Sequence, residues 1–431
     1  MNIVQLTPGT GNFHCGSCLR DHALVRGLRA RGHDALLVPL YLPHVVDESA
    51  ADARTPIFLS GISIHLDQHY PALRHRPAWL DRLLSAPRLL GLCAHLAGLT
   101  SAATLGASTV AMLQPGGGAQ ARELARLVAW LRSQPRPDLI VLSNVLLAGL
   151  ARPLRDQLGV PVISTMQGED SFLDGLPEPH RAQAWDLLAA RCREVDHFVA
   201  ISRYFGDLMA RHLALPAERI SVVYPGLALD DFAAPPQPAA PPVIGYLARL
   251  TAGKGLGVLV DAFIELKRRD RIPGLRLCAA GAQAGRDEAY VAELQTRLAA
   301  AGLASAVSFR PNLDRAQKLE FLRGLSVLSV PATYGEAFGL YVLEALAAGV
   351  PVAQPRHGAF PEVLEQTGGG VLCAPDDPIA LADALEQVLR DPAQARRLGE
   401  AGRRVVHDRF SAAAMAAQAE AVYADVVRRN A

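Results

Sequence analysis

Short apolar runs alternate with longer amphipathic stretches along the first half of the chain. The runs are NIVQLT (2–7), HDALLVPL (33–40), PDLIVLSN (137–144), VPVISTM (160–166) and HFVAIS (197–202). Continuous apolar runs of this length are typical of strands that are buried on both faces of a parallel sheet. Residues 19–31, between the first two runs, have a helical pattern. The alternation therefore predicts an α/β fold, with helices on both faces of a parallel sheet.

The alternation restarts after a proline-rich segment, AAPPQPAAPP, at 233–242. Such a segment can neither continue a helix nor join a central strand, so it predicts a linker. Further strand patterns follow, and these are VIGYLA (243–248), LRLCAAG (275–281), VSFRP (307–311), LSVLSVP (325–331), VPVAQP (350–355) and GGVLCA (369–374). Helical patterns cover 257–268 and 287–301, and another begins at 338. The second half therefore repeats the organisation of the first.

These patterns predict two doubly wound domains joined by a hinge. We expect an N-terminal domain over 1–235, a linker over 236–242 and a C-terminal domain over 243–408. An Ala-rich helix within 409–431 is expected to pack back on the N-terminal domain. Two such domains on a hinge form a cleft, and ligands of doubly wound sheets bind beyond the carboxyl ends of the strands.

The charge balance excludes one class of function. The chain has 43 basic and 42 acidic residues and a net charge of +1, which predicts no chain-wide attraction to nucleic acid or to an anionic membrane. Its six cysteines are too few and too scattered for a disulfide framework, and the N-terminus lacks the pattern of a signal peptide. We therefore expect a cytoplasmic protein that binds no nucleic acid.

Two stretches keep a role at a membrane surface open. Residues 89–113 carry no formal charge, but Gly, Ala, Ser and Thr dilute them, which favours a soluble or surface-lying helical region over a membrane span. Residues 70–90 combine four arginines with Trp79 and many leucines. This stretch is either an amphipathic lip that touches a membrane or an apolar acceptor, or a helix that covers the sheet. Asp81 and two prolines interrupt its basic face and favour the covering helix.

The stretch YGEAFGLYVLEALAAGVPVAQP, at 334–355, carries paired acids around a helix start. We expect Glu336 at the helix start and Glu344 within the helix. Open amides at a helix start favour negative charge, so those of 338–341 suit a diphosphate. Carboxylates on either side suit the hydroxyls of a hexose and a ribose. Alternatively, Glu336 caps the helix and Glu344 faces solvent, but Glu344 lies among apolar residues and therefore needs a partner.

The stretch GYLARLTAGKGLGVLVDAF, at 245–263, displays two cations beyond a strand. The strand ends near Arg249, a glycine-rich turn carries Lys254, and a helix follows. Cations in this position are placed to neutralise a diphosphate. The alternative is an exposed loop with ordinary basic residues.

Together these motifs resemble the retaining glycosyltransferases of family four, which have the two-domain GT-B fold. The family has an Arg and a Lys before a Glu-x7-Glu pair, and here these are Arg249, Lys254, Glu336 and Glu344. Other similar segments extend the resemblance over nearly the whole chain, and they are LRARGHDALLVPLY (28–41), RISVVYPGLALDDF (219–232) and GAFPEVLEQTGGGVLCAPDDP (358–378). The resemblance implies two Rossmann-like, doubly wound parallel-sheet domains that face a central cleft.

The resemblance also implies a role for each of these residues. Arg249 and Lys254 would hold the diphosphate and stabilise the charge that develops on it, Glu336 would bind the donor sugar, and Glu344 the ribose. Backbone amides would contact sugar and phosphate, and these belong to Ala337, Phe338, Gly339 and Leu340. In this family the leaving phosphate is thought to accept the acceptor's proton, so the resemblance implies no metal, no cofactor and no protein nucleophile.

The segment HCGSC, at 14–18, allows three interpretations. In the resembling family a Gly-Gly turn follows the first strand, one helix length before a Gly-His pair, which here is at 32–33. That spacing places the turn at Cys15 and Gly16, where Gly16 lets the backbone approach a phosphate. The alternatives are a redox pair formed by Cys15 and Cys18, or a metal site, for which a second CxxC is missing.

The chain departs from the family where a His often follows the strand VPVISTM. It has Gln167 there, and a neutral amide still forms hydrogen bonds with a hydroxyl or a carbonyl of the donor. Glu169 and Asp170 follow directly, and they are candidates for acceptor binding or else parts of a solvated loop. The acceptor itself, a saccharide, a lipid-linked or a small molecule, is not identified by the sequence.

The sequence favours a retaining enzyme that moves a hexosyl unit from a nucleotide-diphosphate sugar to an acceptor. A non-catalytic sensor or scaffold that binds sugar nucleotides is the alternative, motivated by the cysteines at 15 and 18 and by Gln167. An epimerase with the same fold would need acid–base groups beside the sugar ring, and the motifs supply no such set.

Overall fold

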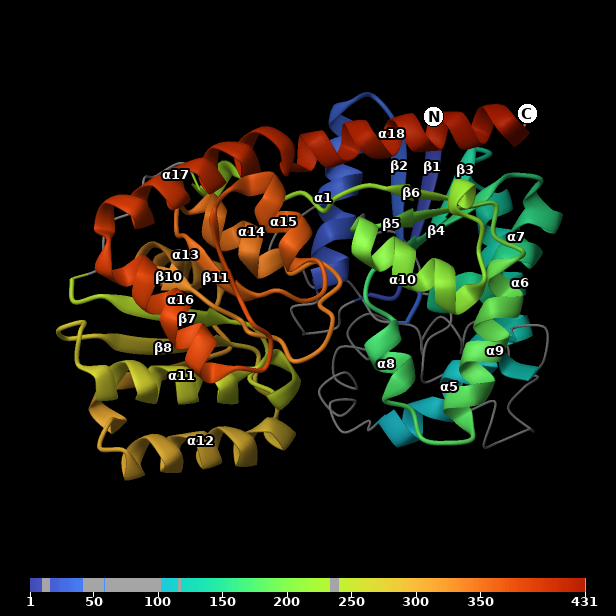
Figure 1. Ribbon diagram of the computed structural model, residues 1–431. Coiled ribbons are helices and arrows are strands. Elements are labelled where there is room, and N and C mark those ends of the chain that lie inside the picture. The colour runs from blue at the N-terminus through green and yellow to red at the C-terminus, as the bar shows by residue number, and fades with distance from the viewer. Residues whose placement is uncertain (10–15, 42–57, 59–101, 115–117, 233–239, 431) are drawn as a thin grey trace. The chain divides into compact units, whose positions relative to one another are not determined.

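The computed structural model describes residues 1–9, 16–41, 58, 102–114, 118–232 and 240–430 (Figure 1). They form two compact units, of which unit 1 comprises 1–226 with 412–431 and unit 2 comprises 227–411. Most of the expected linker, and all of the possible lip at 70–90, lie outside the described residues. Unit 2 begins earlier than expected because Leu227 donates its N–H to the Phe410 carbonyl at 2.8 Å, next to its bridge with Ser411.

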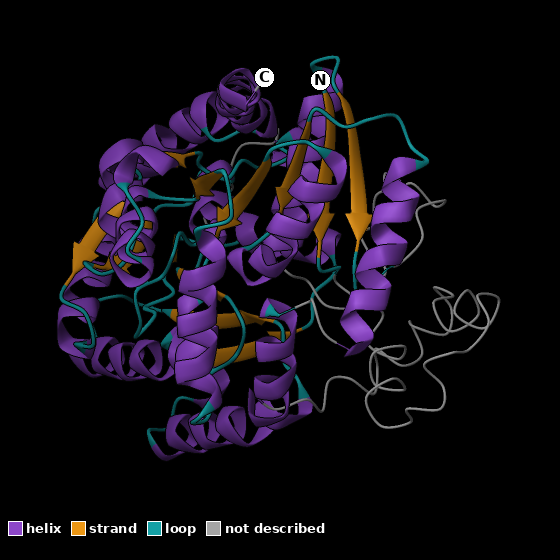
Figure 2. Ribbon diagram, turned by 90° about the vertical axis from the view of Figure 1, so that its right-hand side faces the viewer, coloured by secondary structure: helices purple, strands orange, loops and turns teal. Residues whose placement is uncertain are grey.

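Unit 1 contains a six-stranded parallel sheet with the order β2-β1-β3-β4-β5-β6. Its strands are β1 (Asn2–Thr7), β2 (Asp34–Pro39), β3 (Leu139–Leu142), β4 (Val162–Met166), β5 (His197–Ala200) and β6 (Ile220–Val222). Figure 2 shows the arrows of this sheet running in the same direction. The five apolar runs in this half are confirmed as strands, and β6 was missed because it has only three residues.

The helices of unit 1 are α1 (Gly16–Ala30), α5 (Ala102–Leu113), α6 (Gly118–Arg132), α7 (Ala151–Leu158), α8 (Asp170–Asp174), α9 (His180–Cys192), α10 (Arg203–Leu213) and α18 (Ala412–Asn430). The first of them begins at Gly16, three residues before the start that its apolar pattern indicated. Among the described residues, none of the helices combines the length and apolar character that a bilayer crossing demands.

Unit 2 contains a second six-stranded parallel sheet, with the order β12-β11-β10-β7-β8-β9. Its strands are β7 (Val243–Leu247), β8 (Arg276–Gly281), β9 (Val307–Pro311), β10 (Val327–Leu328), β11 (Val352–Pro355) and β12 (Gly370–Cys373). Its helices are α11 (Leu256–Arg269), α12 (Glu288–Ala300), α13 (Arg315–Arg323), α14 (Leu340–Ala347), α15 (Phe360–Thr367), α16 (Pro378–Arg390) and α17 (Pro392–Arg409). The predicted α/β class with two doubly wound parallel sheets is therefore confirmed.

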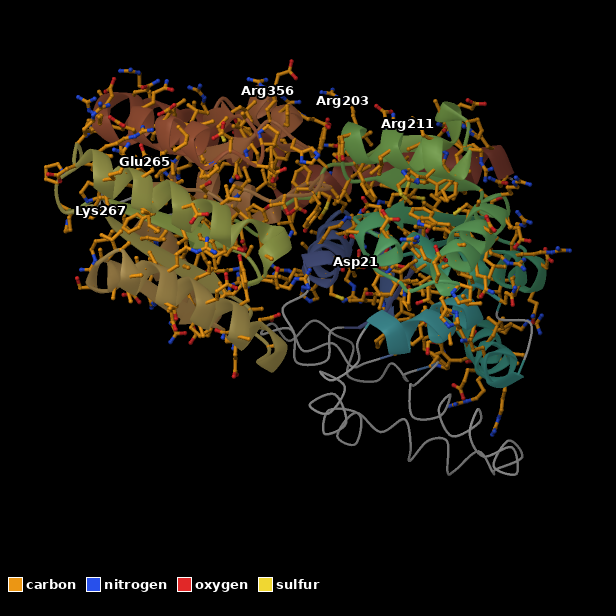
Figure 3. The ribbon with its side chains drawn as sticks, turned by 60° about the horizontal axis from the view of Figure 1, so that its bottom comes forward. Asp21, Arg203, Arg211, Glu265, Lys267 and Arg356 are labelled. Atoms are coloured by element: carbon orange, nitrogen blue, oxygen red, sulfur yellow. The ribbon has the colours of Figure 1, made fainter. Side chains whose placement is uncertain are left out.

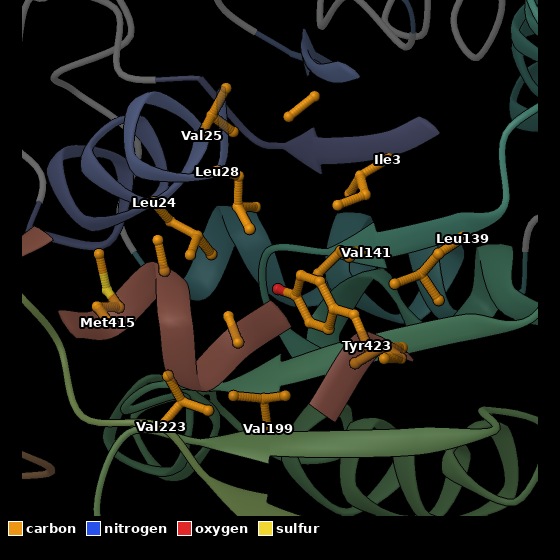
Figure 4. Packing of buried hydrophobic residues seen from close by; sticks show 14 of the residues in the cluster. Ile3, Leu24, Val25, Leu28, Leu139, Val141, Val199, Val223, Met415 and Tyr423 are labelled. Atoms are coloured by element: carbon orange, nitrogen blue, oxygen red, sulfur yellow. The ribbon is translucent and has the colours of Figure 1, made fainter. Parts of the chain in front are cut away.

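The last helix belongs to the first unit. One face of α18 is apolar and buries Met415, Ala419 and Tyr423 against α1 and the sheet (Figure 4). A Cβ at Gly27 of α1 would lie 2.7 Å from the Cβ of Ala416, so a glycine allows the two helices to approach this closely. The closing helix therefore packs back on the N-terminal unit through a shared hydrophobic core.

Each sheet has one point at which the strand order reverses. In unit 1 the chain moves outward from β1 to β2 and then returns to β3 on the other side of β1. In unit 2 it moves from β7 through β8 to β9 and returns to β10 beside β7. Loops that leave neighbouring strands at such a point diverge to opposite faces and leave room for a ligand. The described candidate site residues follow β7 and β10 in unit 2, and β1 and β4 in unit 1.

Candidate functional site

Two loops of unit 2 meet where β7 and β10 end. The loop after β7 carries Arg249 and Lys254, and the loop after β10 carries Glu336. Thr333 joins the loops by donating its N–H to the Gly253 carbonyl at 3.1 Å. Gly255 has a φ of +75°, and a Cβ there would lie 1.7 Å from the carbonyl oxygen of Pro331. Only glycine fits this approach, which fixes Lys254 beside the second loop.

The two predicted site residues Lys254 and Glu336 form an ion pair. Lys254 Nζ lies 2.5 Å from Glu336 Oε2, and the two side chains are 13% and 12% exposed. The hydroxyl of Tyr341 donates to the same carboxylate oxygen at 2.8 Å. Lys254 Nζ also lies 5.0 Å from the ring centroid of Tyr334 and 5.6 Å from that of Tyr341, within the range of cation–π attraction. Lys254 and Glu336 are thus held by each other and by two tyrosines.

The charges of this pair stabilise one another. Burial lowers the pKa of Lys254, but attraction from Glu336 and Tyr334 outweighs it, so the pKa is raised from its ordinary value. Burial and the Glu336 carboxylate raise the pKa of Tyr341 well above its ordinary value, so its hydroxyl stays a donor. At neutral pH Lys254 therefore stays an ammonium and Tyr341 a neutral phenol.

Arg249 is the exposed cation of the site. Its backbone carbonyl accepts a hydrogen bond from the Tyr246 hydroxyl at 2.7 Å, which ties the loop to the buried end of β7. Within the described part of the chain, no side chain is hydrogen-bonded to its guanidinium. The Arg249 side chain is therefore available to bind an anion, with five N–H donors.

The backbone of Glu336 is held from a third loop. Ala359 donates its N–H to the Glu336 carbonyl at 2.9 Å. Gly358 has a φ of +60°, and a Cβ there would lie 2.5 Å from the Glu336 nitrogen and 2.6 Å from its oxygen. The turn after β11 therefore sets the position of Glu336, and it can do so only with glycine at 358.

The helix after Glu336 starts later than the sequence indicated. It was expected from residue 338 with Glu336 at its start, but α14 begins at Leu340, because Gly339 has a left-handed φ of +86°. Glu336 therefore lies in the preceding loop and does not cap the helix. No side chain caps α14 in the described structure, so the first amides of this helix can receive an anion.

The expected need of Glu344 for a partner is confirmed. Lys318 of α13 places its Nζ 2.6 Å from Glu344 Oε1, and the two side chains are 28% and 17% exposed. Glu344 thus does not simply face solvent. The ion pair uses one carboxylate oxygen and leaves the other for a further hydrogen bond.

In unit 1, Gln167 lies just beyond β4 and contacts the residue just beyond β3. Its Nε2 donates to the Ser143 carbonyl at 2.5 Å and to Ser143 Oγ at 3.3 Å. Glu169 lies beneath the same loop, where Oε2 accepts from the Gln167 N–H at 2.8 Å and Oε1 from the Val145 N–H at 3.3 Å. The carboxyl ends of these two strands are thereby joined.

Glu169 is a buried support and not part of a solvated loop. It is 5% exposed, and burial raises its pKa to about 7. Its two backbone hydrogen bonds leave further lone pairs on the carboxylate, so acceptor binding by Glu169 stays a prediction. Asp170 begins α8 and is partly exposed, so its binding to an acceptor stays a prediction.

The cysteine pair is only partly described. Gly16 is the first residue of α1 and is exposed, whereas Cys15 lies outside the described residues. Cys18 is a thiol that is 1% exposed, with Sγ 3.9 Å from Thr7 Oγ1. A thiol buried in this way is not an exposed nucleophile, and because its possible partner Cys15 lies outside the described residues, the redox interpretation of the pair stays a prediction. In the described ranges no group of three or more His, Cys, Asp or Glu side chains could hold a metal ion.

Known protein families are similar to this chain over residues 101–405. Residues 230–405 match the family model for glycosyl transferases group 1, and residues 101–231 match the model for Glycosyltransferase Family 4. A D-inositol 3-phosphate glycosyltransferase of Corynebacterium diphtheriae is 31% identical over 297 residues, which are 63% of this chain and 67% of that protein. This chain belongs to glycosyltransferase family 4.

Other relatives support the family and the fold. A D-inositol 3-phosphate glycosyltransferase of Xylanimonas cellulosilytica is 32% identical over 250 residues, which are 54% of this chain and 58% of that protein. The family 4 chain thus spans little more than half the length of this curated relative. The structure of sucrose-phosphate synthase from Thermosynechococcus elongatus superposes with a TM-score of 0.72 at 21% identity, covering 99% of both chains. The fold is therefore GT-B, as the motifs implied.

The two matched regions of this family 4 glycosyltransferase contain the two groups of site residues. Arg249, Lys254 and Glu336 lie in the group 1 region, and Gln167 and Glu169 lie in the family 4 region. Sequence reasoning predicted these five and Glu344 as site residues but missed the side chains that contact them, which are Tyr334, Tyr341, Lys318 and Ser143. The two tyrosines flank Glu336 in the motif itself, whereas no pattern in the sequence connects Lys318 with Glu344.

Proposed function

We propose that this family 4 glycosyltransferase moves a hexosyl unit from a nucleotide-diphosphate sugar to an acceptor hydroxyl with retention of configuration. The observation that carries the proposal is the assembled group at the β7–β10 switch point. There Lys254 pairs with Glu336 at 2.5 Å, Arg249 has an exposed guanidinium, and the start of α14 has no side-chain cap. Two cations beside open amides match the charge and shape of a diphosphate.

In this proposal, donor binding redistributes the contacts of the Lys254–Glu336 pair. Phosphate oxygens compete with Glu336 for Lys254 Nζ, which frees part of the carboxylate to accept a hydroxyl of the hexose. Tyr341 keeps its hydrogen bond to Glu336 and so holds the carboxylate in place. Glu344 accepts from the ribose hydroxyls through the oxygen that Lys318 does not use.

The bond that breaks joins the anomeric carbon to the β-phosphate oxygen. Negative charge develops on the leaving diphosphate, and Arg249 and Lys254 stabilise it. The acceptor hydroxyl attacks from the same face, and its proton passes to the leaving phosphate oxygen. Two cations balance the charge of the diphosphate, so we propose that the reaction needs no metal ion.

The acceptor is proposed only as a class. The curated relatives are named for an inositol phosphate acceptor, but this chain spans little more than half the length of the Xylanimonas protein. We therefore propose a hydroxyl-bearing acceptor, either a saccharide, a lipid-linked molecule or a small molecule, that binds through unit 1.

Donor turnover tests this proposal without knowledge of the acceptor. The protein is incubated with UDP-glucose, GDP-mannose or ADP-glucose, and the hexose released by slow transfer to water is followed by NMR. We expect the α-anomer to appear first from the α-linked donor. Lys254→Met should lower the rate by about 100-fold or more, whereas Lys267→Met, a change outside the site on α11, should not (Figure 3).

One result would favour the non-catalytic alternative. If a nucleotide sugar binds but is neither hydrolysed nor transferred to any of a panel of saccharide and polyol acceptors, the chain is a sensor. If the β-anomer appears first, the enzyme exists but inverts the configuration.

A further inference from the structure

Strand β11 of unit 2 carries one buried polar side chain among apolar ones. Gln354 is 0% exposed, whereas the other residues of this strand are apolar. Its Oε1 accepts a hydrogen bond from the backbone N–H of Val330, just beyond β10, at 3.2 Å. Because an N–H group can only donate, the accepting atom must be the amide oxygen. Gln354 therefore reaches from β11 to the start of the loop that carries Glu336.

This contact takes the place of a backbone hydrogen bond between two neighbouring strands, β10 and β11 (Figure 1). Leu328 donates its N–H to the Pro351 carbonyl at 3.0 Å, and the pairing of the two strands goes no further. In a regular parallel ladder the next N–H on this side is that of Val330, and its partner would be the Ala353 carbonyl. Val330 instead donates to the side chain of Gln354. The chain thus leaves β11 at Val330, and an amide side chain spans the gap.

The same segment also leaves β7, on the other side of β10. Ser329 donates its N–H to the Gly245 carbonyl at 2.9 Å, and the next residue that could continue this pairing is Pro331, which has no N–H. Ala332 then turns back and donates its N–H to the Val330 carbonyl at 2.8 Å. Val330 is therefore the point at which the loop starts, and Gln354 is the side chain that fixes it.

The start of the loop determines where both charges of the site lie. The Pro331 carbonyl packs against Gly255, where an added Cβ would be only 1.7 Å away, so a shift of the loop must also move the turn of Lys254. Thr333 is hydrogen-bonded to the same turn, and Glu336 follows three residues later. A displacement of the loop start is thereby transmitted to both members of the ion pair.

The nitrogen of the Gln354 amide argues against a purely stabilising role. Gln354 Nε2 is buried, and in the described part of the chain it has no hydrogen-bond partner. A buried donor without a partner destabilises the folded state, which offsets what the hydrogen bond to Val330 contributes. What the side chain supplies is an acceptor at a fixed distance from β11.

We propose that Gln354 is a positioning residue of the donor site, which holds the β10 loop so that Lys254 and Glu336 meet as a pair. Gln354 acts through Val330 and touches no ligand. This inference rests on the proposed function, because that function assigns Lys254 to the diphosphate and Glu336 to the sugar of the donor.

Two substitutions at Gln354 separate its oxygen from its volume. Gln354→Met removes the acceptor at similar volume. Gln354→Glu keeps an oxygen at the same distance and exchanges only the nitrogen that has no partner, and burial favours the neutral acid. Binding is measured by calorimetry with the tightest ligand among UDP-glucose, GDP-mannose and ADP-glucose. Gln354→Met should weaken this binding by about tenfold, and Gln354→Glu should stay within about threefold of the wild type.

The matched control is Ser326→Ala, at the opposite end of the same strands. Ser326 Oγ accepts a hydrogen bond from the Val243 N–H at 3.1 Å, so this variant also leaves a backbone N–H without its side-chain partner. Its melting temperature should fall, but its affinity for the nucleotide sugar should remain that of the wild type. If Ser326→Ala lost as much affinity as Gln354→Met, the role of Gln354 would be merely structural and the proposal would be rejected.

A double-mutant cycle shows whether Gln354 acts through the ion pair. In a Lys254→Met background, Gln354→Met should weaken binding of the same nucleotide sugar by about twofold or less, because the pair that it positions is already broken. A tenfold loss in both backgrounds would mean that Gln354 acts independently of Lys254, and this result would overturn the proposal.

The remaining outcomes separate this inference from the proposed function. If neither a nucleotide sugar nor a nucleoside diphosphate binds the wild type, the proposed function fails, and this inference fails with it. If the nucleotide sugar binds and Gln354→Met keeps wild-type affinity, or Gln354→Glu binds no better than Gln354→Met, only the positioning role is rejected. If Gln354→Met does not fold, Gln354→Asn takes its place with the same expected loss, because its amide is one methylene too short to reach Val330.

Discussion

At the scale of single residues, the charged side chains near the switch points are held by specific partners. Lys254 and Glu336 hold each other, Lys318 holds Glu344, and two backbone N–H groups hold Glu169. Partners of this kind keep a charged side chain in one orientation, so the side chain loses less conformational entropy when a ligand binds. The first consequence concerns Glu169, because burial raises its pKa to about 7.

Glu169 makes stability depend on pH. Its pKa is about 7 in the folded protein and 4.5 without burial, so the folded state binds more protons between these values. The free energy of unfolding should therefore fall as pH rises from 4.5 to 7, by about 3 kcal/mol from this group. Glu169→Gln should remove this slope, which melting temperatures between pH 4.5 and pH 8 would measure.

The matched control for this experiment is Glu178→Gln. Glu178 is exposed, and hydrogen bonds from Ala182 and Arg181 lower its pKa, so its replacement should not flatten the slope between pH 4.5 and pH 7. If wild type and Glu169→Gln had parallel pH profiles, the charge at 169 would not be buried in solution.

The motifs revealed which residues carry charge but not which of them touch. Lys254 and Glu336 were predicted as separate ligands of phosphate and sugar, yet they are 82 positions apart in sequence and form a direct pair. Such a contact depends on two loops that leave neighbouring strands, which is a property of sheet order. The burial of Glu169 could not be predicted either, because polar residues in a loop-like segment give no signal of what covers them.

At the scale of elements, glycines at tight turns decide where helices begin and how loops approach one another. The start of α14 was predicted two residues too early, because a single φ of +86° at Gly339 delays the helix. Strands were easier to predict, since nearly continuous apolar runs leave few alternatives. Gly358 shows how such a glycine affects the site. The absence of a Cβ there lets the turn after β11 lie directly against the backbone of Glu336.

We expect Gly358→Ala to displace Glu336. The new Cβ would lie 2.5 Å from the Glu336 nitrogen, so that loop must move, in addition to a strain of about 1–2 kcal/mol for alanine at positive φ. Binding of the nucleotide sugar should weaken by about tenfold, and binding of the free nucleoside diphosphate much less. Calorimetry with both ligands measures the difference.

Gly302→Ala is the control, because Gly302 has a similar φ of +73° and nothing within 4 Å of the added Cβ. Gly302→Ala should lose about as much stability as Gly358→Ala does, but it should bind both the nucleotide sugar and the free nucleoside diphosphate with wild-type affinity. Equal affinities for Gly358→Ala and Gly302→Ala would mean that the turn after β11 does not position Glu336.

At the scale of the whole molecule, the chain forms two units with the same architecture and one returning helix. Each unit has a six-stranded parallel sheet with its own switch point. Both doubly wound patterns were readable from the sequence, because the central strands of each sheet, such as β3, β4, β10 and β11, are buried on both faces. We expected the closing helix to pack back on the N-terminal domain, but its close approach to α1 at Gly27 required the structure.

The central claim is that Arg249 and Lys254 of unit 2 bind the diphosphate of the donor. It is tested most directly by comparing the affinities of a nucleoside diphosphate and its monophosphate, for uridine, guanosine and adenosine. The wild type should prefer one diphosphate by about tenfold or more, and the double variant Arg249→Met with Lys254→Met should reduce this preference to about twofold. The control variant Lys267→Met should keep the wild-type preference for the diphosphate. A wild type that does not distinguish diphosphate from monophosphate, or a double variant that retains the full preference, would contradict the claim.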